Sequence, residues 1–110
     1  MEDRELLELA AKSALITPQG YGISGVATRK NGACLVGWWN PLNDDGDAFR
    51  LAAQLRLEVI PGKHSGDGCS VNSRRHEIPG VTVFRDSKDM AEQMRRAIVM
   101  AAAEIGKTIP

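Results

Sequence analysis

The segment 61–76 holds three side chains that could do chemistry, those of His64, Cys69 and His76. Two imidazoles and a thiol form a ligand set that zinc prefers. Four residues separate the first two and six separate the last two, so the sequence lacks the compact CxxC or HxxxH spacing of zinc motifs. A cysteine beside a histidine can also act as nucleophile and base, although no nucleophile elbow surrounds Cys69. An enzyme or metal site here is therefore one alternative, and no catalytic, metal-binding or cofactor-binding residue is assigned.

Acidic side chains crowd the segment 43–47, which reads Asn-Asp-Asp-Gly-Asp. Calcium favours such clustered carboxylates. With Gly46 at the sixth position of an EF-hand loop, however, Pro41 and Ala52 would occupy the first and twelfth positions, and neither can ligate through its side chain. We therefore interpret these residues as a helix start, where a polar side chain caps the first-turn amides and negative charge faces the positive end of the helix dipole.

Four arginines could form a basic surface. Arg74 and Arg75 lie in the segment 61–76, and Arg95 and Arg96 lie in the predicted last helix. Clustered guanidiniums can bind phosphates, but few aromatic residues lie near enough in the sequence to stack bases. A nucleic-acid-binding module that uses this loop and Arg95 and Arg96 is therefore a second alternative.

Two adjacent tryptophans, Trp38 and Trp39, end a strand-like run. Adjacent residues of a strand face opposite sides of the sheet. If one ring enters the core, the other points away and either packs under a helix or loop or anchors an interface, as tryptophan often does. Together with the four arginines, the pair defines the interaction surface that the sequence predicts.

The composition is that of an ordinary globular protein. The chain has 110 residues, 43% of them hydrophobic, with 14 Lys plus Arg and 14 Asp plus Glu. This length suits one domain over residues 1–110, and the balanced charge lacks the strong field of many nucleic-acid or anionic-membrane binders. The two cysteines are far apart, no leader-like segment opens the chain, and no apolar run approaches the roughly 20 residues that span a bilayer. We expect a cytoplasmic protein with no membrane partner.

Apolar periodicity and turn residues predict an α+β fold, a small and mainly antiparallel sheet of about four strands covered by three helices. The order is α-β-β-α-β-(β)-β-α. Helices are predicted over 2–15, 43–55 and 87–105, strands over 26–30, 33–39, 57–60 and 81–85, and a further strand at 69–72.

Three finer expectations follow from the same patterns. Phe49 and Ala53 should widen the buried stripe of the second helix. Gly106 should terminate the last helix. The segment 17–25, with one proline and three glycines, should be a loop.

Two segments of the chain resemble a family of small tailed-phage and prophage proteins with a phage α/β/α sandwich domain. They are WNPLNDDGDAFRL at 39–51 and RRAIVMAAAEIGK at 95–107, which together make up about a quarter of the chain. The resemblance implies a phage or prophage origin and a sandwich of helices around a small sheet. It implies no catalytic residues.

Small size, balanced charge and the resemblance together favour a non-enzymatic phage or prophage accessory protein. We expect it to bind a host protein stoichiometrically in the bacterial cytoplasm, with a host-defence component as one candidate. A homodimer is a second expected association, because small domains gain buried area when they associate.

Overall fold

The computed structural model describes residues 2–14, 18–22, 25–29, 35–62, 68–73, 75–83 and 90–109. These residues form three helices and six strands, in an order where three strands follow each of the first two helices. The helices are α1 (Asp3–Ser13), α2 (Asp45–Leu55) and α3 (Met90–Lys107), and the strands are β1 (Pro18–Gly22), β2 (Gly25–Arg29), β3 (Leu35–Trp39), β4 (Leu57–Ile60), β5 (Cys69–Ser73) and β6 (Val81–Val83).

The described strands form two antiparallel sheets, β1-β2-β3 and β4-β5-β6, each with its strands in chain order. The α+β class is confirmed, but the prediction of one sheet of about four strands is wrong. The strands before α2 pair only with one another, as do the strands after it, and β1 adds an unpredicted edge strand to the first sheet from within the predicted loop 17–25. A first-residue proline such as Pro18 is tolerated in an edge strand, and cross-strand pairing outweighs the poor strand propensity of glycine.

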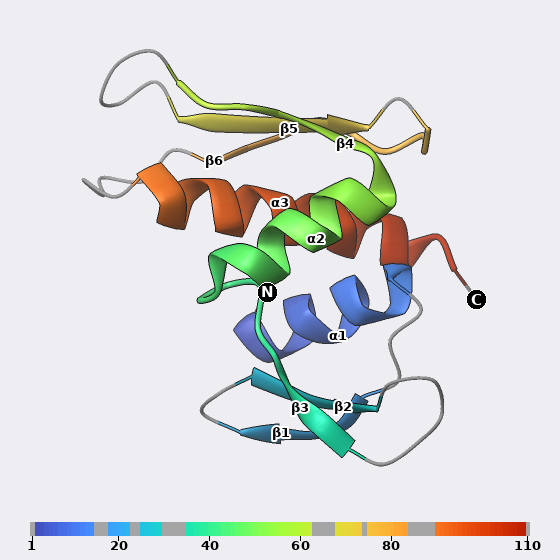
Figure 1. Cartoon of the computed structure of the whole chain (residues 1–110). Helices are drawn as coiled ribbons and strands as arrows, with labels where there is room; N and C mark the ends of the chain where they lie inside the picture. Colours follow the sequence, from blue (N-terminus) through green and yellow to red (C-terminus); the bar gives the residue numbers. More distant parts are fainter. Residues whose placement is uncertain are drawn as a thin grey trace.

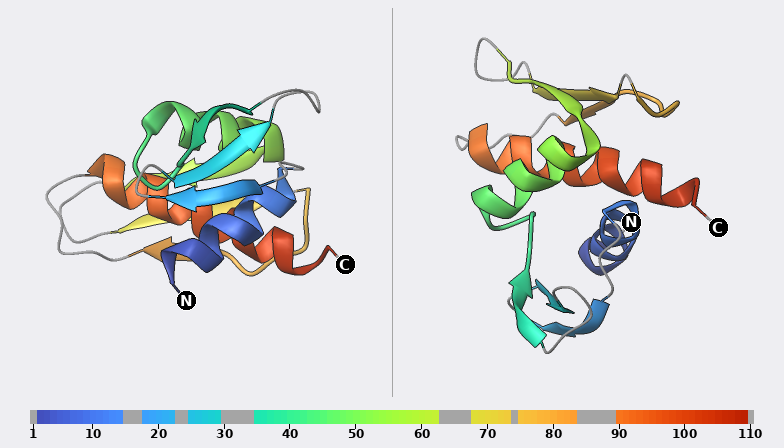
Figure 2. Two further views of the ribbon diagram at one scale, coloured as in Figure 1. Left: turned by 90° about the horizontal axis from the view of Figure 1, so that it is seen from below. Right: turned by 45° about the vertical axis from the view of Figure 1, so that its right-hand side comes forward.

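The helices lie between the two sheets (Figure 1). Sheet β4-β5-β6 covers α3 and α2, α1 packs on the other side of α3, and sheet β1-β2-β3 lies beyond α1, as the second view of Figure 2 also shows. This layer order is the reverse of the expected sheet covered by helices. The cause is α3, which is buried around most of its circumference and therefore occupies the centre. Its buried residues are Gln93, Ala97, Ile98, Val99, Ala101, Ala102, Ala103, Ile105 and Gly106.

Helices α1 and α3 pack with their backbones close together. A Cβ atom on Gly106 would overlap the carbonyl group of Leu9 in α1, so the crossing requires glycine at this position. Ala10 and Ala11 of α1 are also fully buried. The prediction that Gly106 ends the last helix is wrong, because α3 continues to Lys107. The glycine permits the close approach of two helices.

Helix α2 begins as the sequence predicts and buries the predicted stripe. Asp44 is the N-cap, and its carboxylate accepts a hydrogen bond from the backbone N–H of Asp47 at 2.8 Å. The buried residues of α2 are Ala48, Leu51, Ala52 and Leu55. The prediction for Phe49 and Ala53 is wrong, because both are exposed and Phe49 is 74% accessible to solvent. None of the described helices has the length and apolar character that crossing a membrane requires.

Candidate functional site

The turn between β3 and α2 is held by backbone and carboxylate hydrogen bonds. The carbonyl of Asn40 accepts from the N–H groups of Asn43 at 3.1 Å and Asp44 at 2.8 Å. The N–H of Asn40 donates to Asp47 Oδ2 at 2.9 Å, while Arg50 donates to Asp47 Oδ1 at 2.7 Å. The acidic side chains at 44 and 47 are therefore engaged in building the turn and the helix start, as the capping interpretation predicts.

Arg95 ties this turn to α3. Its Nε donates to the carbonyl of Leu42 at 2.9 Å, and its terminal nitrogen forms an ion pair with Asp45 at 2.6 Å. The Arg95 side chain is only 15% exposed. Charge-assisted hydrogen bonds to a partly buried guanidinium are stronger than those of an exposed one, so Arg95 fixes α2 against α3.

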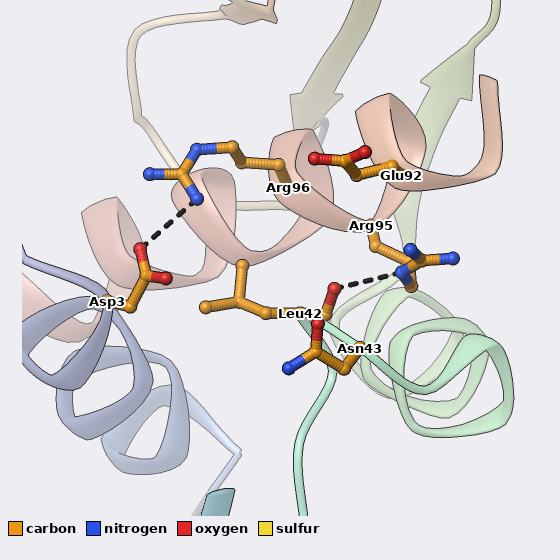
Figure 3. Close-up of a pocket in the computed structure, with 6 residues that line it drawn as sticks. All are labelled: Asp3, Leu42, Asn43, Glu92, Arg95 and Arg96. Atoms are coloured by element: carbon orange, nitrogen blue, oxygen red, sulfur yellow. Dashed lines mark hydrogen bonds and ion pairs between the residues drawn. The ribbon is translucent and has the colours of Figure 1, made fainter. Parts of the chain in front are cut away.

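A polar cavity of about 410 Å³ opens on one side of Arg95, and Figure 3 shows the residues around it. Arg96 of α3 points across it toward Asp3 of α1, with 3.2 Å between the guanidinium nitrogen and the carboxylate oxygen. The lining residues are Asp3, Leu42, Asn43, Glu92, Arg95 and Arg96. Two carboxylates and two guanidiniums balance in charge, so this cavity lacks the positive field that would attract a phosphate.

An apolar groove of about 370 Å³ lies on the other side of Arg95. It runs between the N-terminal halves of α2 and α3, and Val59 of β4 also lines it. Its apolar lining consists of Ala48, Phe49, Val59, Ala91, Met94 and Ile98. Asp45 and Arg95 complete the lining. We call this the Phe49 groove, because the ring of Phe49 is both part of its wall and largely exposed to solvent.

The two tryptophans do not form an exposed surface pair within the described part of the chain. Trp39 is 9% exposed and belongs to the hydrophobic core, and its backbone pairs with Val26 of β2. The backbone of Trp38 pairs with Ala27, and its side chain lies outside the described residues. Trp39 therefore stabilises the fold, as one of the two rings was expected to do.

Two of the four arginines that were predicted to form a basic surface contact other elements of the chain. Arg95 and Arg96 point toward carboxylates and the carbonyl of Leu42. Arg75 is exposed in the segment after β5, and Arg74 lies outside the described residues. The structure thus assigns Arg95 and Arg96 to contacts between elements of this chain.

Cys69 and His76 are kept apart by strand β5. Cys69 begins β5, its side chain is fully buried, and burial raises the pKa of its thiol. Four residue steps at about 3.3 Å put Ser73, the last residue of β5, about 13 Å away. The N–H of His76 donates to Ser73 Oγ at 2.9 Å, which holds His76 near that far end. His64 lies outside the described residues, and among those described no three His, Cys, Asp or Glu side chains gather into a cation-binding cluster.

The groove is the feature that reasoning from the sequence missed. The signal was present in α2, where Phe49 sits at the edge of the arc formed by Ala48, Leu51, Ala52 and Leu55. A large aromatic at such an edge can either extend the core or border a surface groove, and helical periodicity cannot distinguish the two. Comparison with protein-family models, curated proteins and solved structures found no match for this chain.

Proposed function

We propose that this chain is a non-enzymatic protein that acts by stoichiometric binding to another protein through the Phe49 groove. The observation that carries the proposal is the 74% exposure of Phe49 at the wall of an apolar groove. Exposed apolar grooves with charged ends are typical of protein interaction sites, and aromatic side chains contribute strongly to binding there. Burying the Phe49 ring against a partner would remove this apolar surface from water.

The resemblance of segments 39–51 and 95–107 to phage and prophage proteins supports a host protein as the partner. In this proposal the chain is a phage or prophage accessory protein of the bacterial cytoplasm, and a defence component is one candidate for its target. Binding is favoured over catalysis because the polar groups near the groove have structural partners. Arg95 is held by Leu42 and Asp45, and Asp47 is held by Asn40 and Arg50.

A capture experiment with matched variants tests the proposal. The tagged protein is incubated with host lysate under native conditions, and bound proteins are quantified by mass spectrometry. Phe49→Asp should reduce recovery of a stoichiometric partner by at least about 30-fold, because removing a central aromatic typically costs about 2 kcal/mol or more. Ile60→Asp is the matched control, since Ile60 is also an exposed apolar residue, 46% accessible, and does not line the groove.

The control variant should retain the partner at the wild-type level. Recovery of no partner above background would contradict the proposal. Equal recovery with wild type and Phe49→Asp would show that any partner binds a different surface.

A further inference from the structure

We propose that in the free protein the Phe49 groove is occupied by a second copy of this chain, in a two-fold symmetric dimer whose α2 helices run antiparallel. The inference deepens the proposed function, because it names what covers the groove before a partner protein binds. Self-association and partner binding then exclude one another, since both bury Phe49. The proposal rests on the charge and shape of one face of α2.

Four exposed residues of α2 and its C-cap form this face. Asp45, Phe49, Ala53 and Arg56 follow one another at intervals of three or four residues, which places them on one side of the helix. Asp45 lies at the N-terminal end and Arg56 at the C-terminal end. Eleven residue steps separate them, or about 16 Å along the axis at a rise of about 1.5 Å per residue. Opposite charges thus flank an apolar centre.

This face is complementary to itself only when the two helices run in opposite directions. A two-fold axis midway between positions 45 and 56 places Asp45 of one copy opposite Arg56 of the second copy, and the reverse pair forms by symmetry. The same axis places Phe49 level with position 52 of the second copy, beside its exposed Ala53. A small side chain facing a large ring lets the two helices approach closely, so that each α2 covers the exposed Phe49 ring at the wall of the other copy's groove. A parallel arrangement would instead bring like charges together.

Both charged ends are available for such a contact. The Asp45 side chain is 74% exposed, and its Oδ1 is held by Arg95, which orients the carboxylate and leaves Oδ2 to accept from a second copy. Arg56 is exposed, and its side chain has no ion-pair partner within the described part of the chain. Arg56 also adopts a left-handed backbone conformation with φ of 54° at the C-cap, where glycine is preferred. An arginine at this strained position supplies the charge that the antiparallel pair uses.

Sedimentation equilibrium from micromolar to millimolar concentration tests the inference. The wild type should show a reversible monomer–dimer equilibrium. Phe49→Asp should raise the dimer dissociation constant at least about 100-fold, because the central aromatic is lost twice in a symmetric interface. Ile60→Asp should dimerise as the wild type does. At a concentration low enough for every protein to be monomeric, the circular dichroism and the urea midpoint of each variant should match those of the wild type, because both side chains are exposed.

Charge reversal tests the antiparallel register. Asp45→Arg alone sets two arginines against each other across the interface, and Arg56→Glu alone sets two carboxylates against each other, so each should weaken its own dimer about 10-fold. An equimolar mixture of the two variants should form a heterodimer near wild-type strength, because both contacts again pair opposite charges. If loss of the Arg95 contact unfolds Asp45→Arg, the Phe49→Asp and Arg56→Glu measurements still decide the question.

A wild type that stays monomeric throughout would overturn the inference. So would a dimer that Phe49→Asp leaves intact, or two folded charge variants that fail to form the heterodimer. These results are distinct from the capture experiment. A monomeric protein that loses its partner with Phe49→Asp would support the proposed function and contradict this inference. A dimer that depends on Phe49, in a protein for which no host partner is recovered, would support this inference and contradict the proposed function.

Discussion

Replacing Gly106 with alanine tests the close packing of α1 against α3. Helix propensity alone predicts that alanine stabilises the last turn of α3 by about 1 kcal/mol relative to glycine. The structure predicts the opposite sign, because the new Cβ would overlap the carbonyl carbon and oxygen of Leu9. Overpacking costs about 1–3 kcal/mol, and we take the upper end because a backbone carbonyl cannot rotate away. Ile105, 2% exposed, anchors this turn, so α3 cannot easily move away from α1. A cost of about 3 kcal/mol less the propensity gain of about 1 kcal/mol gives an expected net loss of about 2 kcal/mol.

Urea denaturation followed by circular dichroism measures this loss as a lower midpoint at unchanged slope. A thermal melt should show a midpoint about 10 °C lower for a domain of this size. Gly46→Ala in α2 is the matched control. Its Cβ would lie 3.2 Å from the terminal nitrogens of Arg50 and 3.3 Å from Asp44 Oδ2, and both of these side chains are mostly exposed and can shift by a few tenths of an ångström. This variant should be neutral or stabilised by up to about 1 kcal/mol. A Gly106→Ala protein at least as stable as the wild type would refute the α1–α3 contact.

The remaining predictions concern the core. Trp39→Ala should lower the free energy of unfolding by about 3–5 kcal/mol in urea denaturation, and an equal loss for Trp38→Ala would mean that both rings are structural. Cys34 is the other cysteine of the chain, so its thiol is removed by Cys34→Ser. In that background the Cys69 thiol should react with a thiol reagent only after unfolding, and rapid reaction of the folded protein would contradict its burial. Burial raises the pKa of Cys69 above the ordinary value of 9.0, so the stability that the neutral thiol contributes is complete below that pH and lost above it. The free energy of unfolding should therefore fall as the pH rises past about 9, and by less in Cys69→Ala.

Local patterns along the chain were sufficient for α2 and its start. The cap at Asp44, the stripe at Ala48, Leu51, Ala52 and Leu55, and the end of β3 before Asn40 all agree with the prediction. Each depends on residues within a few positions of one another, because capping and helical periodicity are short-range effects. The strands β4 and β5 were predicted for the same reason, with ends within one residue of those observed.

Features that depend on pairing with another segment of the chain, whether adjacent or distant, were predicted poorly. Strand β1 exists because β2 supplies its hydrogen-bond partners, and its own residues favour a loop. The roles of Arg95 and Arg96 also depend on distant residues, since their carboxylate partners lie 50 and 93 positions away. A basic run in the sequence does not show whether its charges face water or another element of the same chain.

By itself the sequence determined an α+β chain with three helices, a capped α2 and an apolar α3. Which surfaces meet was decided only by the tertiary structure, where α3 enters the centre and the sheets become the outer layers. The apolar arc of α2 is wider than the surface that α3 and β4 can cover, so Phe49 remains outside and borders the groove. Periodicity along one helix specifies the direction of each side chain, while burial depends on the shape and size of the elements packed against it.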